Sequence, residues 1–116
     1  MSYQEEAYKF AKYKNKEYPF LALGEEAGEV LGKLAKYVRK NNVSIGEAID
    51  NTLDVDCVDG EKLLVDLAYE LGDVLWQVNA CCTELKLDVR MIEDINLAKL
   101  RGRDRRNTII GSGDNR

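Results

Sequence analysis

The chain has 116 residues, the length of one small domain (1–116) that can enclose a modest core. It carries 17 Lys and Arg against 21 Asp and Glu, and the net charge of −4 gives no support for a nucleic-acid partner. No apolar run approaches the ~20 residues that cross a bilayer, and the N-terminus lacks a signal pattern. The three cysteines lack zinc-ligand spacing, so we expect reduced thiols in a cytoplasmic protein without a membrane partner.

Apolar residues recur with helical spacing through most of the chain, and strand signals are weak. A first helix is predicted over residues 2–16, with Pro19 either ending it or beginning the next segment. The second helix is predicted over residues 21–40. The serine-x-x-glutamate capping box at Ser44 predicts a short helix over residues 44–50.

The second half of the chain continues this pattern. Residues 51–60 are rich in Asp, Asn and Gly and are predicted to be a loop. A third main helix is predicted over 61–86, and a fourth from the capping residue Asp88 to about residue 103. The tail, 108–116, is polar and rich in glycine, as flexible segments are. We therefore predict an all-α fold, a helical bundle of four main helices.

Broad apolar stripes run along the predicted helices and are expected to pack on a core. In the second and third main helices they comprise Leu23, Ala27, Val30, Leu31, Leu34 and Val38, and Leu63, Leu64, Leu67, Leu71, Val74, Leu75 and Val78. In the fourth they comprise Val89, Ile92, Ile95 and Leu100. Glycine recurs every fourth residue at Gly24, Gly28 and Gly32, and each costs roughly 1 kcal/mol relative to alanine. Close approach of another helix or space for a ligand would explain this series.

Two acidic signatures border the stripes, Glu25-Glu26-x-x-Glu29 and Glu70-x-x-Asp73. Side chains three residues apart in a helix lie about 60° from each other, so each signature presents a carboxylate pair on one face. If the two helices pack through their stripes, the pairs meet and repel unless a divalent cation compensates them. Oxygen ligands in a chain without histidine suit Mg²⁺ or Mn²⁺. The alternative is solvated charge on exposed helix faces.

This arrangement resembles the paired motif of the MazG-like nucleotide pyrophosphohydrolases, within the all-α NTP pyrophosphatase superfamily. The resemblance runs from the first helix to the fourth. The tail, from Arg103 through Ile110-Gly111-Ser112-Gly113-Asp114-Asn115-Arg116, is similar to endings of short, often phage-encoded members. One departure is the spacer, because Glu70 follows Glu29 by 41 positions, more than is usual. Residues 43–60 look like the insertion, which could be a lid, an oligomer contact or an element without a role.

The resemblance implies cleavage of a ribo- or deoxyribonucleoside triphosphate between the α and β phosphates, giving the monophosphate and pyrophosphate. By the family's motif, Glu26, Glu29, Glu70 and Asp73 would be the ligands of Mg²⁺ or Mn²⁺. Glu25 and Glu29 would be the catalytic carboxylates. Glu25 could orient or deprotonate the attacking water, or it could instead form a salt bridge beside the site.

Cationic and polar partners for the substrate are expected on the fourth helix. Family members use an asparagine and a lysine from the region of Asn96 and Lys99. Further candidates for phosphate contact are Arg103, Arg105, Arg106 and Arg116. The alternative for this basic run is favourable charge at a helix C-terminus. Trp76 follows Asp73 by three residues and either stacks on a nucleobase or packs at a subunit contact.

Similar proteins form dimers, or tetramers built from dimers, so we expect a homodimer or a homotetramer. Two other functional classes compete with the enzyme. A ferritin-like di-iron protein would normally carry two Glu-x-x-His motifs, and this chain has no histidine. A non-catalytic helical interaction module would leave the acidic faces solvated and would consume no triphosphate. The sequence does not identify the base or the sugar of the substrate.

Overall fold

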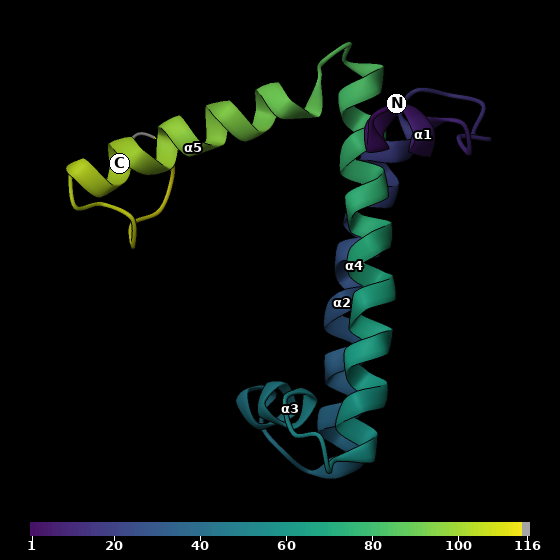
Figure 1. Ribbon diagram of the computed structural model, residues 1–116, viewed down its shortest axis with the longest axis vertical. Coiled ribbons are helices and arrows are strands. Elements are labelled where there is room, and N and C mark those ends of the chain that lie inside the picture. The colour runs from purple at the N-terminus through teal and green to yellow at the C-terminus, as the bar shows by residue number, and fades with distance from the viewer. Residues whose placement is uncertain (115–116) are drawn as a thin grey trace.

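The computed structural model describes residues 1–114, and within them the chain forms five helices and no strand. The helices are α1 (Tyr3–Tyr8), α2 (Tyr18–Asn41), α3 (Ile45–Thr52), α4 (Val58–Glu84) and α5 (Val89–Arg105). In Figure 1, α2 and α4 lie side by side as a long antiparallel hairpin. α1 packs at one end of this hairpin, α3 packs at the other, and α5 projects away from it. The predicted all-α class is confirmed.

Local signals set the ends of the two long helices. Pro19 lies in the first turn of α2, where its missing N–H costs nothing, so it belongs to the start of this helix and does not end the first one. Asn42 ends α2 in the left-handed conformation, with φ of 52°. α4 ends at Glu84, and Lys86 after it has φ of 58°. The second and third main helices therefore match their predicted ranges to within three residues.

α2 and α4 bury only part of their apolar stripes against each other. Leu23, Val30 and Leu34 on α2 are partly buried, as are Leu67, Val74 and Val78 on α4. The rest of the same stripes is open to solvent, with exposed fractions of 47–59% at Leu31, Leu64, Leu71 and Leu75. The stripes are therefore wider than the seam between the two helices, and they leave apolar surface for a further contact.

α3 closes the end of the hairpin over a small core. The capping box at Ser44 is formed in both directions with Glu47, as predicted. Ala48 is fully buried and packs with Tyr37 of α2 and Leu63 of α4. The insertion at 43–60 thus covers the core at the end of the hairpin.

The loop predicted over residues 51–60 is wrong at both ends. α3 continues through Thr52, α4 starts at Val58, and only residues 53–57 connect them. Asp59, which was assigned to the loop, lies with Glu61 in the first turn of α4, where both complement the positive end of the helix dipole. The pattern of acidic residues marked a helix N-terminus.

The first helix is shorter than the predicted range of 2–16 because it ends at Tyr8. The indole Nε1 of Trp76 donates a hydrogen bond to the backbone oxygen of Ala7 over 3.2 Å. The same oxygen accepts from the amide of Phe10 at 3.1 Å, so the helix tightens into turns there. The chain from residue 9 to 17 then runs to α2 and places the Tyr13 hydroxyl 2.8 Å from a carboxylate oxygen of Glu84.

α5 begins as predicted at Asp88, whose carboxylate accepts from the amide of Arg90 at 2.9 Å. The Arg90 guanidinium, and after it this backbone hydrogen bond, lower the pKa of Asp88 to about 2. The expectation that Ile95 and Leu100 face inward is wrong within one chain, because they are 59% and 37% exposed. α5 has no extensive contact with another helix.

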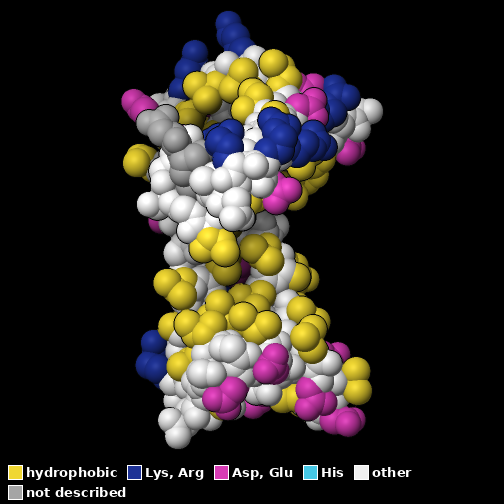
Figure 2. Space-filling view, turned by 90° about the vertical axis from the view of Figure 1, so that its left-hand side faces the viewer, with side chains coloured by type: hydrophobic (Ala, Val, Ile, Leu, Met, Phe, Trp, Pro, Cys, Tyr) yellow, Lys and Arg dark blue, Asp and Glu magenta, His cyan; other side chains and the backbone are white. Residues whose placement is uncertain are grey.

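The single chain has more surface than a compact domain. Its accessible area is 8702 Å² and its radius of gyration is 17.4 Å. A globular monomer of this mass would have about 6,400 Å² and about 13 Å. Figure 2 looks at the face of the hairpin between α5 and α3, where hydrophobic side chains gather.

Among the described helices, none combines the length and the apolar character needed to cross a membrane.

The glycines differ in what surrounds them. A Cβ added to Gly24, Gly28, Gly32 or Gly72 would meet no atom within 4 Å, so close packing inside this chain does not explain that series. A Cβ on Gly60 would overlap the backbone carbonyl of Asn51, whose carbon would lie 2.5 Å away. α3 and α4 therefore touch through backbone at Gly60.

We predict that Gly60→Ala lowers the free energy of unfolding by about 1–3 kcal/mol, because the added methyl forces α3 away from α4. Gly32→Ala is the matched control, and it should raise stability by up to about 1 kcal/mol through helix propensity. Urea unfolding followed by circular dichroism measures both variants. Equal stability of the two variants would contradict the close backbone contact.

Candidate metal centre

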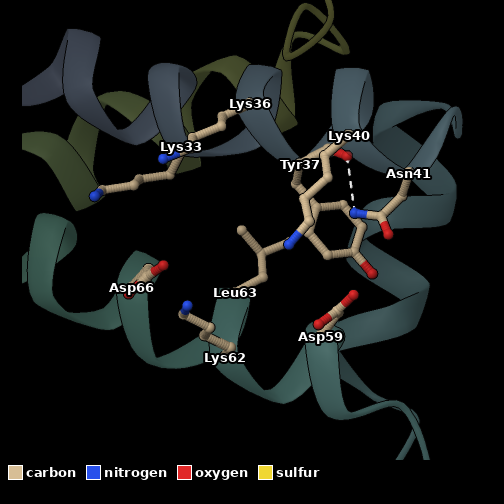
Figure 3. A pocket seen from close by; sticks show the side chains of 9 residues that line it. All are labelled: Lys33, Lys36, Tyr37, Lys40, Asn41, Asp59, Lys62, Leu63 and Asp66. Carbon is tan, nitrogen blue, oxygen red and sulfur yellow. Dashed lines mark hydrogen bonds between the residues drawn. The ribbon is translucent and has the colours of Figure 1, made fainter.

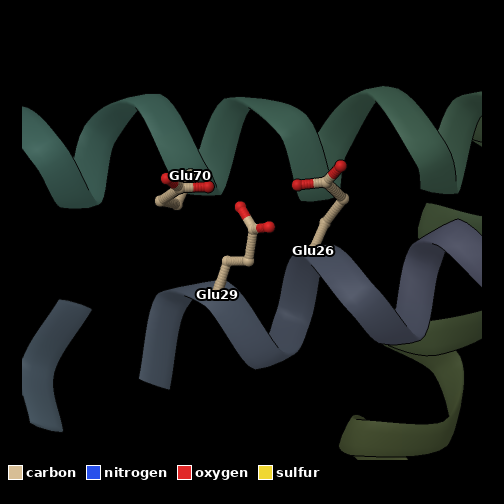
Figure 4. A group of neighbouring side chains, drawn as sticks. All are labelled: Glu26, Glu29 and Glu70. Atoms are coloured by element: carbon tan, nitrogen blue, oxygen red, sulfur yellow. The ribbon is translucent and has the colours of Figure 1, made fainter. Parts of the chain in front are cut away.

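Three glutamates from two helices meet in the seam between α2 and α4. Glu26 and Glu29 lie three residues apart on α2, and Glu70 faces them from α4. One carboxylate oxygen from each lies within 4.8 Å of the others, and Figure 4 shows the three side chains converging between the helices. Sequence reasoning predicted this convergence from the helical spacing of the two acidic pairs.

The site carries more negative charge than the protein compensates. Burial raises the pKa of Glu26, and the charges of Glu29, Asp73, Glu70 and Glu25 raise it further. Burial also raises the pKa of Glu70, and the neighbouring Glu29 carboxylate raises it further. Both carboxyl groups would therefore lower their free energy by binding a proton or a cation.

Among residues 1–114, one cation reaches this group, and its contact is long. The Lys33 ammonium lies 3.8 Å from Oε1 of Glu70, which lowers the pKa of that carboxyl. The other oxygen of Glu70, Oε2, is buried and has no hydrogen-bond partner among the described residues. An unpaired buried carboxylate oxygen, opposed by two further carboxylates, is a fitting ligand for a hard divalent cation.

Asp73 and Glu25 lie beside the three glutamates. Asp73 is exposed on α4, and its charge raises the pKa of both Glu26 and Glu70. Glu25 is exposed on α2 and also raises the pKa of Glu26. All five acidic residues of the two signatures are thus gathered in one region of the hairpin, with Glu26, Glu29 and Glu70 closest together.

An aromatic pocket adjoins the acidic group at Glu26. Its volume is about 500 Å³, and we call it the aromatic pocket. Its lining includes Phe10, Tyr13, Tyr18, Trp76, Gln77, Lys12 and Lys14. The rings of Tyr13 and Tyr18 stack with their centroids 5.6 Å apart. Sequence reasoning missed this wall because it placed residues 9–16 in a helix, although their alternation of aromatic residues and lysines was visible.

Trp76 lies between α1 and the acidic group. Its ring is partly buried and lines both the aromatic pocket and a second open groove, which also contains Asp73 and Gly72. Its indole nitrogen is held by the Ala7 oxygen, so the orientation of the ring is fixed within the chain. The ring is therefore placed where a ligand beside the acidic group could contact it.

The candidates on α5 lie away from the acidic group of their own chain. Asn96, Lys99 and Arg103 are on the projecting helix, whose position Figure 1 shows. The tail folds back on α5, and Asp114 pairs with Lys99 and with the buried Arg103, each at 3.0 Å. Arg105 and Arg106 lie at the end of α5, and Arg116 lies outside the described residues.

Comparison with known proteins identifies the family. Residues 14–107 match the MazG nucleotide pyrophosphohydrolase domain. The chain is 35% identical over 99 residues to the Gene 37 protein of Mycobacterium phage L5, covering 85% of this chain and 75% of that protein. No solved structure matches. The chain belongs to the MazG nucleotide pyrophosphohydrolase family, whose members usually use a divalent metal.

We predict that Mg²⁺ raises the melting temperature of the metal-free protein, because a bound cation compensates the three glutamates. Stabilisation of about 1.4 kcal/mol is expected at ten times the dissociation constant. Glu70→Gln should abolish this response and also raise the melting temperature without metal, since it removes one repelling charge. Differential scanning calorimetry with EDTA and with Mg²⁺ measures both effects.

The matched control is Glu93→Gln, an exposed glutamate on α5 that should leave the Mg²⁺ response unchanged. A Glu70→Gln variant that responds to Mg²⁺ as the unaltered protein does would remove Glu70 from the ligand set.

Proposed function

We propose that this protein is a Mg²⁺-dependent nucleoside triphosphate pyrophosphohydrolase, which converts a ribo- or deoxyribonucleoside triphosphate to its monophosphate and pyrophosphate. The observation that carries the proposal is the meeting of Glu26, Glu29 and Glu70 between α2 and α4, in a chain of the MazG family. A triphosphate is itself an anion, so an acidic site can bind it only through cations. We place the reaction in the cytoplasm, in keeping with the three free cysteines.

We assign Glu26, Glu29, Glu70 and Asp73 as the residues that hold Mg²⁺, with Mn²⁺ as an alternative ion. Bound there, the ion would neutralise phosphate charge and acidify water. Through that ion, the three convergent glutamates would fix the position of the α phosphate relative to the helices. The low solvent access at Glu70 strengthens the electrostatic interactions made there.

Water activation is assigned to Glu25 and Glu29. In the proposed reaction, water attacks the α phosphorus, and the bond to the oxygen that bridges the α and β phosphates breaks. The proton of the water passes to a carboxylate, and pyrophosphate leaves with the bridging oxygen. Glu25 is exposed and next to Glu26, so we propose that it receives the proton while Glu29 helps to orient the water.

The aromatic pocket is our candidate for the nucleoside. Its volume of about 500 Å³ is in the range of small-molecule sites, and it borders the metal centre at Glu26. The Trp76 ring offers a face on which a base can stack, and Gln77 offers an amide that can donate and accept hydrogen bonds. Any base can stack on an aromatic face, so the ring does not select among nucleotides. Hydrogen bonds from Gln77 and its neighbours would decide which base is preferred.

Substrate contacts from Asn96, Lys99 and Arg103 require a second copy of the chain. These residues project away from the acidic group of their own chain, while apolar side chains of α5 and of the hairpin are left exposed. We propose a homodimer, or a homotetramer built from dimers, in which α5 of one copy covers the metal centre of the other. Lys99 would then exchange Asp114 for a substrate phosphate.

We predict that Glu29→Gln and Asp73→Asn each lower turnover by about a hundredfold or more, because each removes a charge that positions the α phosphate and the water. Release of pyrophosphate and monophosphate from a panel of ribo- and deoxyribonucleoside triphosphates, and from guanosine tetraphosphate, measures this effect. EDTA should abolish turnover, and Asp50→Asn, which alters an exposed carboxylate on α3, should leave it unchanged. Normal turnover in a folded Glu29→Gln variant would contradict the assignment.

The shared site makes a second prediction. Glu29→Gln and Lys99→Gln variants should each be inactive alone, yet their mixture after subunit exchange should recover activity. In a dimer with one competent site per mixed pair, about a quarter of full activity is expected. Two Glu29→Gln preparations mixed together are the control. A mixture that stays inactive although exchange is demonstrated by mass spectrometry would place α5 outside the partner's site.

The competing function is a helical interaction module with solvated acidic faces. It requires that no triphosphate is consumed and that melting is indifferent to Mg²⁺. The convergence of three glutamates around a buried, unpaired oxygen of Glu70 favours the enzyme.

A further inference from the structure

A second, smaller pocket lies between α2 and α4, further toward α3 than the metal centre. We call it the lysine pocket, and its volume is about 150 Å³. Figure 3 shows its lining, which consists of Lys33, Lys36, Tyr37, Lys40, Asn41, Asp59, Lys62, Leu63 and Asp66. Three of its lysines come from one face of α2 and the fourth from α4, so the two helices hold positive charge on both sides of the cavity.

Positive charge exceeds negative charge in the lysine pocket, although the whole chain is acidic. Four lysines face two aspartates there. Within residues 1–114, Lys36, Lys40 and Lys62 form no ion pair within 4.0 Å, and Lys33 has only its long contact to Glu70. Ammonium groups gathered without partners repel one another, and an anion placed among them would remove that repulsion.

The position of the lysines on their helices does not account for the cluster. Lys40 lies in the last turn of α2, where the helix dipole favours a cation. Lys62, however, lies in the second turn of α4, near the positive end of that helix. Lys33 lies two turns before the end of α2. The lysines share the cavity between the helices, and the dipole explains only one of them.

The floor of the pocket is rigid. Tyr37 and Leu63 are buried members of the core that α3 covers, with exposed fractions of 8% and 3%. The Tyr37 hydroxyl accepts a hydrogen bond from Asn51 at 3.0 Å, and the amide of Asn41 donates to the backbone oxygen of Tyr37 at 3.0 Å. A fixed floor under solvent-exposed lysine side chains suits a small, highly charged ligand.

We propose that the lysine pocket is a binding site for a small phosphate anion, of the size of inorganic phosphate or pyrophosphate. The volume is too small for a nucleoside, whose sites are several times larger. Glu29 and Lys36 are seven residues apart on α2, which is about 10 Å along the helix, so the anion is separate from the α phosphate at the metal centre. Lys33 joins the two sites through its contact with Glu70.

The experiment measures pyrophosphate binding to the full chain by calorimetry in EDTA and low salt. Without divalent metal the acidic centre repels anions, so the measurement does not depend on hydrolysis, and the variants below assign the binding to the lysine pocket. We expect one site per chain, with an affinity that falls as salt is added. In a folded Lys36→Gln/Lys40→Gln variant the affinity should fall at least about tenfold, since two of the four ammonium groups are removed.

The matched control is Lys9→Gln/Arg39→Gln, which changes the net charge equally. Both residues are exposed, Arg39 is next to Lys40 on α2, and neither lines the pocket. It should bind pyrophosphate as the unaltered chain does. No binding to the unaltered chain, or an equal loss in both double variants, would overturn the site, because the effect would then be absent or due to net charge.

A second arm separates free pyrophosphate from the phosphates of a bound nucleotide. The protein is saturated with Mg²⁺ and a triphosphate analogue whose α–β bridging oxygen is replaced by an imido group, and pyrophosphate is then titrated. Binding of pyrophosphate to this complex supports a separate site. Complete competition would show that the nucleotide's own phosphates fill the pocket, and it would overturn the proposal.

Discussion

α2 and α4 pack in an antiparallel pair, and the rotation of each helix about its axis decides where every charged group of the hairpin lies. The core of Tyr37, Ala48 and Leu63 and the backbone contact at Gly60 fix this pairing at the α3 end. With the pairing fixed, Glu26 and Glu29 must face Glu70 across the seam. A shift of one residue along either helix would turn its carboxylates by about 100° and separate them. The acidic group therefore depends on packing that lies several turns away from it.

The features that could be predicted from the sequence are those set by residues within a single helix. The capping residues Ser44 and Asp88 are local signals, and each caps the helix that it was predicted to cap. Pro19 lies in the first turn of α2, although that helix was predicted only from residue 21. The acidic pairs are local signals too, and three of their members, Glu26, Glu29 and Glu70, come together. The predictions failed where a contact distant in sequence decides the outcome. Trp76 takes the carbonyl of Ala7, 69 residues away, and ends α1 early. No spacing within residues 2–16 could have indicated that bond.

The same limit applies to the site. Helical periodicity says which side chains share a face, so the meeting of three glutamates could be predicted from two stripes. It does not say where a helix goes after a turn. The direction of α5, which takes Lys99 and Arg103 away from their own acidic group, depends on the turn at residues 85–88, where Lys86 has φ of 58°. The aromatic pocket could not be predicted for the same reason, because its wall depends on the path that residues 9–17 take between α1 and α2.

The charged groups along the hairpin and the exposed apolar surface of α5 are both left largely without a partner inside the single chain, as far as residues 1–114 show. The aromatic pocket, the three glutamates and the lysine pocket follow one another along the hairpin. Within residues 1–114, the glutamates and the pocket lysines are joined by the long Lys33–Glu70 contact alone, so most of their charge is left for a ligand. α5 has 17 residues, and most of the stability of a helix in a protein comes from packing its apolar face against another element. Its cap at Asp88 and the ion pairs of Asp114 hold its two ends, yet Met91, Ile95 and Leu97 remain exposed along its length. Apolar surface is thus left open both on α5 and on the hairpin, and the second copy of the chain that we propose would cover both.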